Sequence, residues 1–217
     1  MITDYKIISK LGEGKYAFAY HVIERSSKKQ YCMRILKLQK RNGISFEDME
    51  IEVNVLECLD TPFVVKCHKH FEHTDRLVMI TELCELGDFF AMINESKKEQ
   101  KKFTENQIID WMIQILLVMQ QCHHQKILHR DINVKNIFLA NDYSAKLGDF
   151  GAFKILSNSN DKASSIVTTY SSLAPEICAG HKYNHKSDIW SVGIVLYQLC
   201  ALELPFYSTI IQQNYKN

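Results

Sequence analysis

The sequence predicts an α+β fold of two lobes, of which the first is rich in β-strands and the second in helices. Before Glu82, short runs of residues alternate between apolar and polar, as half-buried strands do. After Gly87, apolar residues recur mainly at helical spacing. The chain has 217 residues, which is enough to bury a substantial core. We therefore expect one domain with a junction between its lobes near residues 82–87.

The first lobe is expected to contain strands and one helix. The expected strands cover residues 5–11, 18–25, 30–38, 64–71 and 76–82. Between the third and fourth strands, Phe46, Met49, Val53 and Leu56 recur at helical spacing. This spacing predicts an amphipathic helix over residues 46–59.

Two segments of the second lobe carry clear helix signals. Thr104 and Gln107 have the spacing of a capping box, which predicts the start of a long helix running through Trp111 and Met119. The segment 189–202 is apolar on nearly every face. Because a helix that is apolar all round is usually buried, we expect this segment to be a central helix.

The composition excludes several classes of protein. The formal net charge is +1, so no global basic field attracts nucleic acid or a membrane surface. No apolar run is long enough to cross a bilayer, and the N-terminus lacks the apolar core of a signal peptide. The seven cysteines are scattered without a Cys-x-x-Cys pair, which indicates reduced thiols. We therefore expect a cytoplasmic location, with the nucleus or the cytoskeleton as alternatives.

A glycine-containing segment, Gly12-Glu13-Gly14-Lys15-Tyr16-Ala17, lies between the first two expected strands. Taken alone, this pattern more often marks an ordinary hairpin turn. Its functional interpretation is a phosphate-binding loop, because residues without Cβ let backbone amides approach phosphate oxygens closely. Both interpretations stay open at this point.

A more specific constellation occurs in the second lobe. The segment 129–136 reads His-Arg-Asp-Ile-Asn-Val-Lys-Asn, so that Asp131 can accept a hydroxyl proton and Asn136 can offer an amide oxygen to a metal. The motif Asp149-Phe150-Gly151 follows, and its carboxylate is the kind of hard oxygen ligand that Mg²⁺ prefers. The motif Ala174-Pro175-Glu176 closes the segment that begins at Asp149.

In this order and at these distances, the motifs resemble the signature set of eukaryotic protein kinases. Several stretches are most similar to the NIMA-related (Nek-like) serine/threonine kinases. These stretches are residues 83–88, 126–131, 136–139, 147–151 and 183–190. The resemblance implies a protein-kinase-like fold over residues 1–217, with an N-lobe (1–82), a hinge (82–87) and a partial C-lobe (88–217). The C-lobe would be truncated and lack its last helices.

The resemblance also implies ATP and Mg²⁺ as cofactors and serine or threonine hydroxyls of proteins as substrates. Asp131 would orient and deprotonate the hydroxyl, and Asn136 and Asp149 would hold the metal. Glu52 would pair with Arg34, the basic residue of the third strand. The implied ATP-binding residues are Leu11, Gly12, Glu13, Gly14, Lys15, Ala19, Cys32, Arg34, Thr81, Glu82, Cys84 and Phe138.

Some of these residues have more particular implied roles. Thr81 would be the gatekeeper, and the backbone of residues 82–84 would bond the adenine ring. Cys32 and Phe138 would enclose the ring between apolar surfaces. Asp188 would anchor the catalytic loop from the apolar helix, which is a structural task.

The sequence departs from the family pattern at two positions that matter for activity. Arg34 stands where the family has a lysine, and its planar fork is not equivalent to a compact ammonium group. We expect it to pair with Glu52 while misplacing the phosphates. Asn133 stands where serine/threonine kinases carry a lysine that steadies the transferring phosphate, and it brings no charge. Lys135, two residues later, is a weak candidate to replace it.

Three interpretations of function stay open. The first is an active serine/threonine kinase whose activity is weakened by Arg34 and Asn133. The second is a catalytically impaired pseudokinase that acts as a nucleotide- or partner-binding module. The third is a truncated product without activity of its own. Regulation would act on residues 149–176, where Ser165 matches a phosphorylation site that Arg130 would contact, and could involve a regulatory partner. No nucleic-acid or membrane partner is expected.

Overall fold

A computed structural model describes residues 1–14, 17–36, 46–74, 76–150, 154–155, 172–181 and 184–206. These residues form two compact units. The first unit comprises Met1–Gly87 and Phe138–Gly151, and the second comprises Asp88–Ile137 and Ala152–Asn217. Residues 138–151 therefore fold with the N-terminal part of the chain, although residues 88–137 of the second unit separate the two in the sequence.

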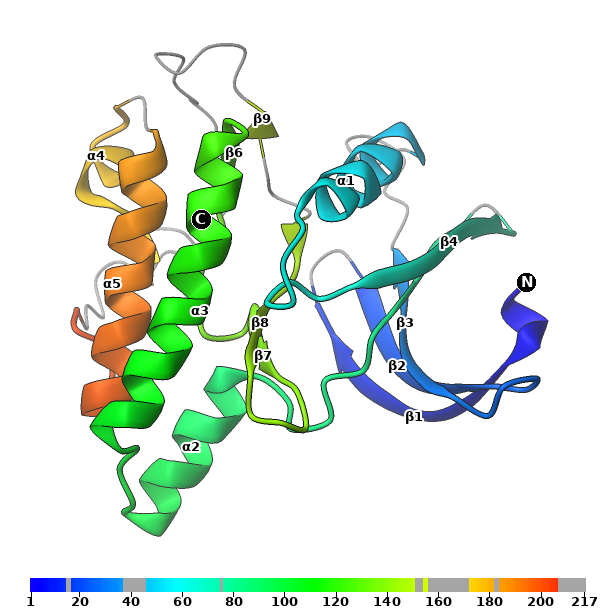
Figure 1. The fold of residues 1–217 in the computed structure, drawn as a ribbon, viewed down its shortest axis with the longest axis horizontal. Helices are drawn as coiled ribbons and strands as arrows, with labels where there is room; N and C mark the ends of the chain where they lie inside the picture. Colours follow the sequence, from blue (N-terminus) through cyan, green and yellow to red (C-terminus); the bar gives the residue numbers. More distant parts are fainter. Residues whose placement is uncertain are drawn as a thin grey trace, which may run out of the picture. The chain divides into compact units, whose positions relative to one another are not determined.

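The first unit is built on a five-stranded antiparallel sheet with the order β1-β2-β3-β5-β4 (Figure 1). Its strands are β1 (Tyr5–Glu13), β2 (Ala17–Glu24), β3 (Gln30–Leu36), β4 (Cys67–His73) and β5 (Arg76–Thr81). A short 3-10 helix, η1 (Ile2–Asp4), precedes the sheet, and helix α1 (Phe46–Cys58) packs against β4. A two-stranded sheet joins β7 (Ile137–Leu139) to β8 (Ala145–Leu147).

Strand β5 lies inside the sheet and is buried on both faces, because its alternate side chains enter two different cores. Val78 and Ile80 pack with Met33 on one face. Leu77 and Met79 pack on the other face, in the cluster that includes Val53 of α1. Each such side chain contributes about 1.5–3 kcal/mol when it is fully buried. This packing fixes β3 and α1, which carry the candidate residues Arg34 and Glu52, relative to each other.

The second unit is mainly helical. Its elements are α2 (Phe89–Glu99), α3 (Glu105–His124), β6 (Ile127–Leu128), β9 (Lys154–Ile155), α4 (Pro175–Cys178) and α5 (His185–Ala201). Helix α3 lies alongside α5 and also contacts β6 (Figure 1). The predicted capping box is confirmed, because Thr104 Oγ1 accepts from the Gln107 backbone N–H at 3.3 Å and Gln107 Oε1 accepts from the Thr104 N–H at 3.1 Å.

The structure corrects two expectations about these elements. The strand expected to begin at residue 64 begins at Cys67, and Val64 instead forms an isolated bridge to Leu147. The expectation that residues 189–202 form a buried central helix holds for one side of α5 only. Its side that includes Val195 and Leu199 is buried, whereas a second group of large apolar side chains is more than a third exposed: Ile189, Trp190, Leu196 and Tyr197. The apolar side chains of α5 are therefore buried on one side of the helix and exposed on another.

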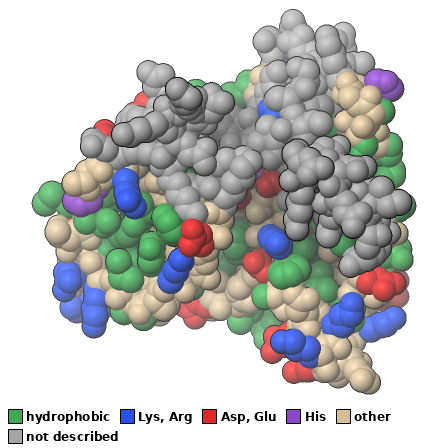
Figure 2. Space-filling view, turned by 180° about the vertical axis from the view of Figure 1, so that it is seen from behind, with side chains coloured by type: hydrophobic (Ala, Val, Ile, Leu, Met, Phe, Trp, Pro, Cys, Tyr) green, Lys and Arg blue, Asp and Glu red, His purple; other side chains and the backbone are tan. Residues whose placement is uncertain are grey.

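Acidic and basic side chains are interspersed over the part of the surface that the described residues form in Figure 2. This mixture agrees with the formal net charge of +1. Among the helices whose residues are described, none combines the length and the apolar content that a membrane span requires.

Candidate active site

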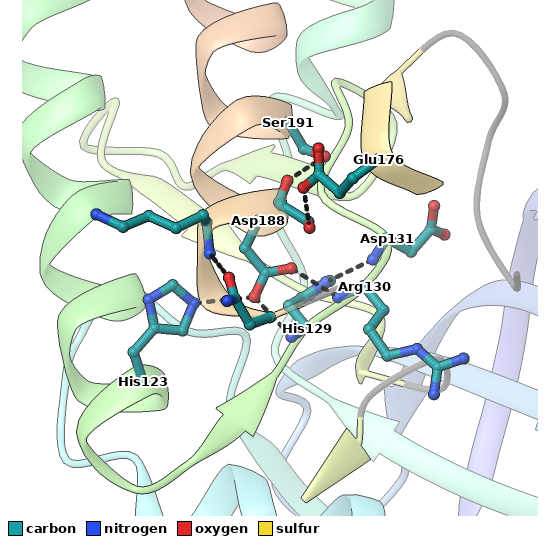
Figure 3. A network of polar contacts seen from close by, with 10 residues as sticks. His123, His129, Arg130, Asp131, Glu176, Asp188 and Ser191 are labelled. Atoms are coloured by element: carbon teal, nitrogen blue, oxygen red, sulfur yellow. Dashed lines mark hydrogen bonds and ion pairs between the residues drawn. The ribbon is translucent and has the colours of Figure 1, made fainter. Parts of the chain in front are cut away.

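The loop between β6 and β7 is anchored by Asp188 in the first turn of α5 (Figure 3). Asp188 Oδ1 accepts from the Arg130 backbone N–H at 3.0 Å, and Oδ2 accepts from the His129 N–H at 3.1 Å. His123 Nε2 on α3 lies 2.9 Å from the same Oδ2. Because Asp188 is buried, these contacts hold the loop to the interior of the second unit. The structural role predicted for Asp188 is confirmed.

Arg130 adopts a φ of 71°, in the left-handed region that non-glycine residues seldom occupy. The adjacent backbone amides of His129 and Arg130 point to the two oxygens of one carboxylate. Asp188 therefore compensates for an unfavourable backbone conformation immediately before Asp131.

Both carboxylate oxygens of Asp131 accept hydrogen bonds from side-chain amides of its own loop. Asn136 Nδ2 donates to Oδ2 at 2.8 Å and to the Asp131 backbone oxygen at 2.8 Å. Asn133 Nδ2 donates to Oδ1 at 3.0 Å and to the same backbone oxygen at 3.1 Å. The loop thus fixes the orientation of the Asp131 carboxylate with neutral donors.

The contact of Asn133 with Asp131 was missed by sequence reasoning, which treated Asn133 only as a lost lysine. A usable signal existed, because asparagine often bonds the backbone two residues later and so forms a tight local turn. Asn133 Oδ1 accepts from the Lys135 backbone N–H at 2.9 Å in this manner. The side chain of Lys135 lies over the ring of Phe90, with Nζ 4.8 Å from the ring centre. In this arrangement Lys135 does not take the place of the missing lysine.

A second cluster lies in the first unit, where Arg34 of β3 contacts two carboxylates. Arg34 Nη1 lies 3.3 Å from Glu52 Oε1 on α1, and Nη2 lies 2.8 Å from Asp149 Oδ1 just after β8. The predicted pairing of Arg34 with Glu52 is confirmed. The contact with Asp149 was not predicted, and no local signal could have shown it, since 115 positions separate the two residues.

The electrostatics of this cluster depend on its burial. The Glu52 side chain is 3% exposed, that of Arg34 19% and that of Asp149 40%. Burial alone would lower the pKa of Arg34, but the carboxylates of Asp149 and Glu52 raise it, so the guanidinium stays charged. Burial raises the pKa of Glu52, and the positive charge of Arg34 opposes that rise.

The chain just before Asp149 packs closely against the ring of Phe138. A Cβ added at Gly148 would come within 2.9 Å of a ring carbon of Phe138 and 3.1 Å of Val65 Cγ2. A glycine is therefore needed for this close approach. Phe150, the next residue after Asp149, is completely buried, while Gly151 lies outside the described residues.

The segment after β5, predicted as a hinge, is fixed at its first residue. The Glu82 carboxylate accepts from the Lys66 backbone N–H at 2.7 Å and from Lys146 Nζ at 2.9 Å. Lys146 Nζ also donates to the Pro62 backbone oxygen at 2.8 Å. Sequence reasoning missed Lys146, because the 64 positions between it and Glu82 leave no local pattern. Thr81, the predicted gatekeeper, is buried beside this anchor.

The predicted adenine site has an available backbone donor. Within the part of the chain that the structure describes, the Cys84 backbone N–H donates to no protein acceptor. Burial and the nearby Glu82 carboxylate raise the pKa of the Cys84 thiol to about 12, so the side chain stays neutral. Cys32 and Phe138 are both partly buried, as surfaces that pack against a ring would be.

The glycine-containing segment forms the β1–β2 hairpin. Gly12 pairs with Ala19, and the Gly14 backbone N–H donates to the Ala17 oxygen at 2.9 Å. The hairpin interpretation is therefore confirmed for the local structure. Lys15 lies outside the described residues. Phosphate binding by this hairpin stays a prediction.

The sheet, the anchored loop and the order of these motifs together define a protein kinase domain. The family model described as "Protein kinase domain" matches residues 5–217, so the chain belongs to this family.

Among curated relatives, the chain is 39% identical over 210 residues to "Serine/threonine-protein kinase Nek5" of Homo sapiens, covering 96% of this chain and 29% of the relative. It is 37% identical over 202 residues to "Serine/threonine-protein kinase Nek1" of Mus musculus, covering 93% and 17%. It is also 37% identical over 205 residues to "Serine/threonine-protein kinase Nek11" of Homo sapiens, covering 93% and 32%. The resemblance to NIMA-related kinases is thus confirmed, and the chain spans less than a third of the length of these relatives.

Proposed function

We propose that this chain is an ATP-dependent serine/threonine protein kinase, which transfers the γ-phosphate of ATP to protein hydroxyls. The observation that carries this proposal is the loop around Asp131. Two amides orient its carboxylate, and Asp188 anchors the backbone that precedes it. Phosphoryl transfer depends mainly on positioning and on charge stabilisation, so a fixed carboxylate suits this reaction.

In this proposal Asp131 orients the substrate hydroxyl and accepts its proton. The hydroxyl approaches a carboxylate whose orientation is already fixed, which reduces the entropy lost on reaching the reactive geometry. The serine/threonine preference is supported by the similarity to the Nek kinases.

Asn136 and Asp149 would hold the magnesium, which supplies charge neutralisation for the phosphates when it is bound. Their donor atoms fit this ion, because Mg²⁺ prefers hard oxygen ligands. Among the described residues, Asn136 Oδ1 accepts no hydrogen bond, since both hydrogen bonds of this side chain use Nδ2. Asp149 fits with one of its oxygens, while Arg34 already contacts the other.

The adenine ring of ATP would bond the backbone of residues 82–84, where the Cys84 N–H is available. Cys32 and Phe138 would supply apolar contact, together with Leu11 and Ala19 at the rim. Arg34, held by Glu52, would supply positive charge for the phosphates. A cytoplasmic location and a regulatory partner stay predictions, as does phosphorylation of Ser165, which lies outside the described residues.

A radiolabel assay tests the proposal, with [γ-³²P]ATP, a generic protein substrate and excess magnesium. We expect transfer that falls by at least about a hundredfold in Asp131→Ala, because a general base contributes roughly 10²–10⁴ in rate. Asp142→Ala is the matched control, since this aspartate is exposed and accepts hydrogen bonds from nearby Ser144. No transfer at high enzyme concentration, or equal transfer in Asp131→Ala, would reject the proposal.

The second candidate is a binding module with impaired catalysis. It is favoured by two observations: Arg34 contacts Asp149, and Asn133 supplies an amide where the family has a lysine. The double variant Arg34→Lys with Asn133→Lys distinguishes the two candidates. A strong gain of transfer over wild type would show that these positions impair the natural chain. Equal transfer would mean that this account of the impairment is wrong.

A further inference from the structure

The contact between Arg34 and Asp149 places a fixed cation at the carboxylate that the proposed site offers to a metal. Arg34 Nη2 lies 2.8 Å from Asp149 Oδ1, which is the distance of a charge-assisted hydrogen bond. The other terminal nitrogen of the same guanidinium, Nη1, donates to Glu52 Oε1 at 3.3 Å. One planar group thus spans two carboxylates from different elements of the first unit.

A lysine would contact the two carboxylates differently, because all of its donors lie on one nitrogen. An ammonium group is a compact point charge, whereas a guanidinium presents several donors in a rigid fork. Glu52 holds Nη1 in a buried position. Because the guanidinium is planar, Nη2 is then directed at Asp149. Arginine at this position therefore makes Asp149 part of a preformed ion pair.

The pair has a direct consequence for divalent ions. A metal bound at Asp149 would share the carboxylate with a like charge only a few ångströms away, and like charges weaken each other's binding. Asp149 Oδ2 has no hydrogen-bond partner among the described residues, so one oxygen stays available, but next to a cation. Mg²⁺ also gives up its water ligands reluctantly, so a partly neutralised carboxylate binds it more weakly than an unpaired carboxylate does.

We infer that Arg34 competes with divalent metal for Asp149, so that nucleoside triphosphate binds this chain with little dependence on magnesium. The inference rests on the nucleotide-binding part of the proposed function and does not require phosphoryl transfer. Arg34 is in this sense a residue that determines which form of the nucleotide, metal-bound or metal-free, the chain accepts.

Isothermal titration calorimetry with ATP tests the inference, once in excess MgCl₂ and once in excess EDTA. For the wild-type chain we expect the two dissociation constants to differ by less than about fivefold, the lower end of ordinary coupling between two ligands. In Arg34→Lys we expect the ratio of the EDTA to the MgCl₂ constant to rise by at least about tenfold. Adding Asp149→Asn to Arg34→Lys should lower the ratio again, because the carboxylate that binds Mg²⁺ in Arg34→Lys is then absent.

Arg25→Lys is the matched control. It makes the same exchange at an exposed arginine of the first unit, whose Nε donates to the Thr3 backbone oxygen at 3.2 Å. Its ratio should equal that of the wild type. Circular dichroism checks that each variant is folded. If Arg34→Lys fails to fold, the wild-type ratio alone decides, and a value above about tenfold overturns the inference.

Three results would overturn the inference: a wild-type ratio above about tenfold, no rise of the ratio in folded Arg34→Lys, or no ATP binding in either solution. Its failure is distinguishable from failure of the proposed function. If the chain binds ATP equally in both solutions but transfers no phosphate, the inference is supported and the proposed kinase activity is rejected. If the chain transfers phosphate but binds ATP only with magnesium, the proposed kinase activity is supported and the inference is rejected.

Discussion

The loop around Asp131 and the cluster around Arg34 each fix a carboxylate, but by different physical means. Asp131 accepts from two neutral amides of its own loop. Asp149 accepts from a guanidinium of a distant strand. Neutral donors orient a carboxylate and leave its charge uncompensated, whereas a guanidinium both orients and neutralises it. The first arrangement suits proton transfer, and the second reduces the attraction for a metal ion.

The two regions also differ because one carboxylate partner of Arg34 is well exposed, although Glu52, which holds Arg34, is as buried as Asp188. The side chain of Asp188, which anchors the loop, is 5% exposed, whereas that of Asp149 is 40% exposed. Interactions of a buried group count for more, because breaking one leaves its partners without water to replace it. The loop anchor should therefore cost more to disturb than the Asp149 end of the cluster, and this ordering can be measured.

The largest effect is expected from Asp188→Ala. The change leaves the buried backbone N–H groups of His129 and Arg130 without an acceptor, and each such donor costs about 1–3 kcal/mol. We expect the free energy of unfolding to fall by roughly 3 kcal/mol or more, measured by urea denaturation. Asp142→Ala, at an exposed aspartate, should leave the free energy of unfolding unchanged within the error of the measurement. A loss below about 1 kcal/mol in Asp188→Ala would contradict the anchoring role.

The next effect compares the two ends of the Arg34 cluster. Glu52→Gln removes the buried charge partner of Arg34 and should cost about 3 kcal/mol of unfolding free energy. Asp149→Asn removes the more exposed partner and should cost less than about 1 kcal/mol, because solvent screens that end. Denaturation in urea at low and high salt measures both. Equal losses of unfolding free energy in the two variants would show that burial does not determine how much each contact contributes to stability.

A smaller effect concerns two cysteines with raised pKa values. Burial raises the pKa of Cys84 in the first unit to about 12, and also that of Cys122 near Asp188 to about 12. Because the thiolate is the reactive form, alkylation of Cys84 by iodoacetamide should be slow at pH 7 and rise about tenfold per pH unit below its pKa. Cys122 is completely buried and should stay unmodified over the same range.

Mass spectrometry of tryptic peptides measures both rates, with exposed Cys200 as an internal standard. A pH-independent rate at Cys84, or modification of Cys122 at the rate of Cys84, would contradict this difference between the regions. Denaturing the chain should make both cysteines reactive, which checks that the reagent reaches them.

Much of the fold could be predicted because its signals are local. The capping box at Thr104 and Gln107 depends on residues three positions apart, and the structure has it. The spacing of Asp131 and Asn136 placed both in one loop, where a direct hydrogen bond joins them. Helix α5 was identified from its apolar sequence, but which of its faces is exposed depends on the elements that pack against it.

The sequence by itself determined the order of the strands and helices, the capping signals and the family motifs, since each depends on residues close together in the chain. Only the tertiary structure decided that Arg34 contacts Asp149 and that Lys146 supports Glu82. Such contacts join residues that the chain separates widely, and they form because packing of β3, α1 and the segment after β8 brings their side chains within hydrogen-bonding distance. Periodicity and spacing in the sequence do not reveal that packing, so the charges around Asp149 could be known only from the folded chain.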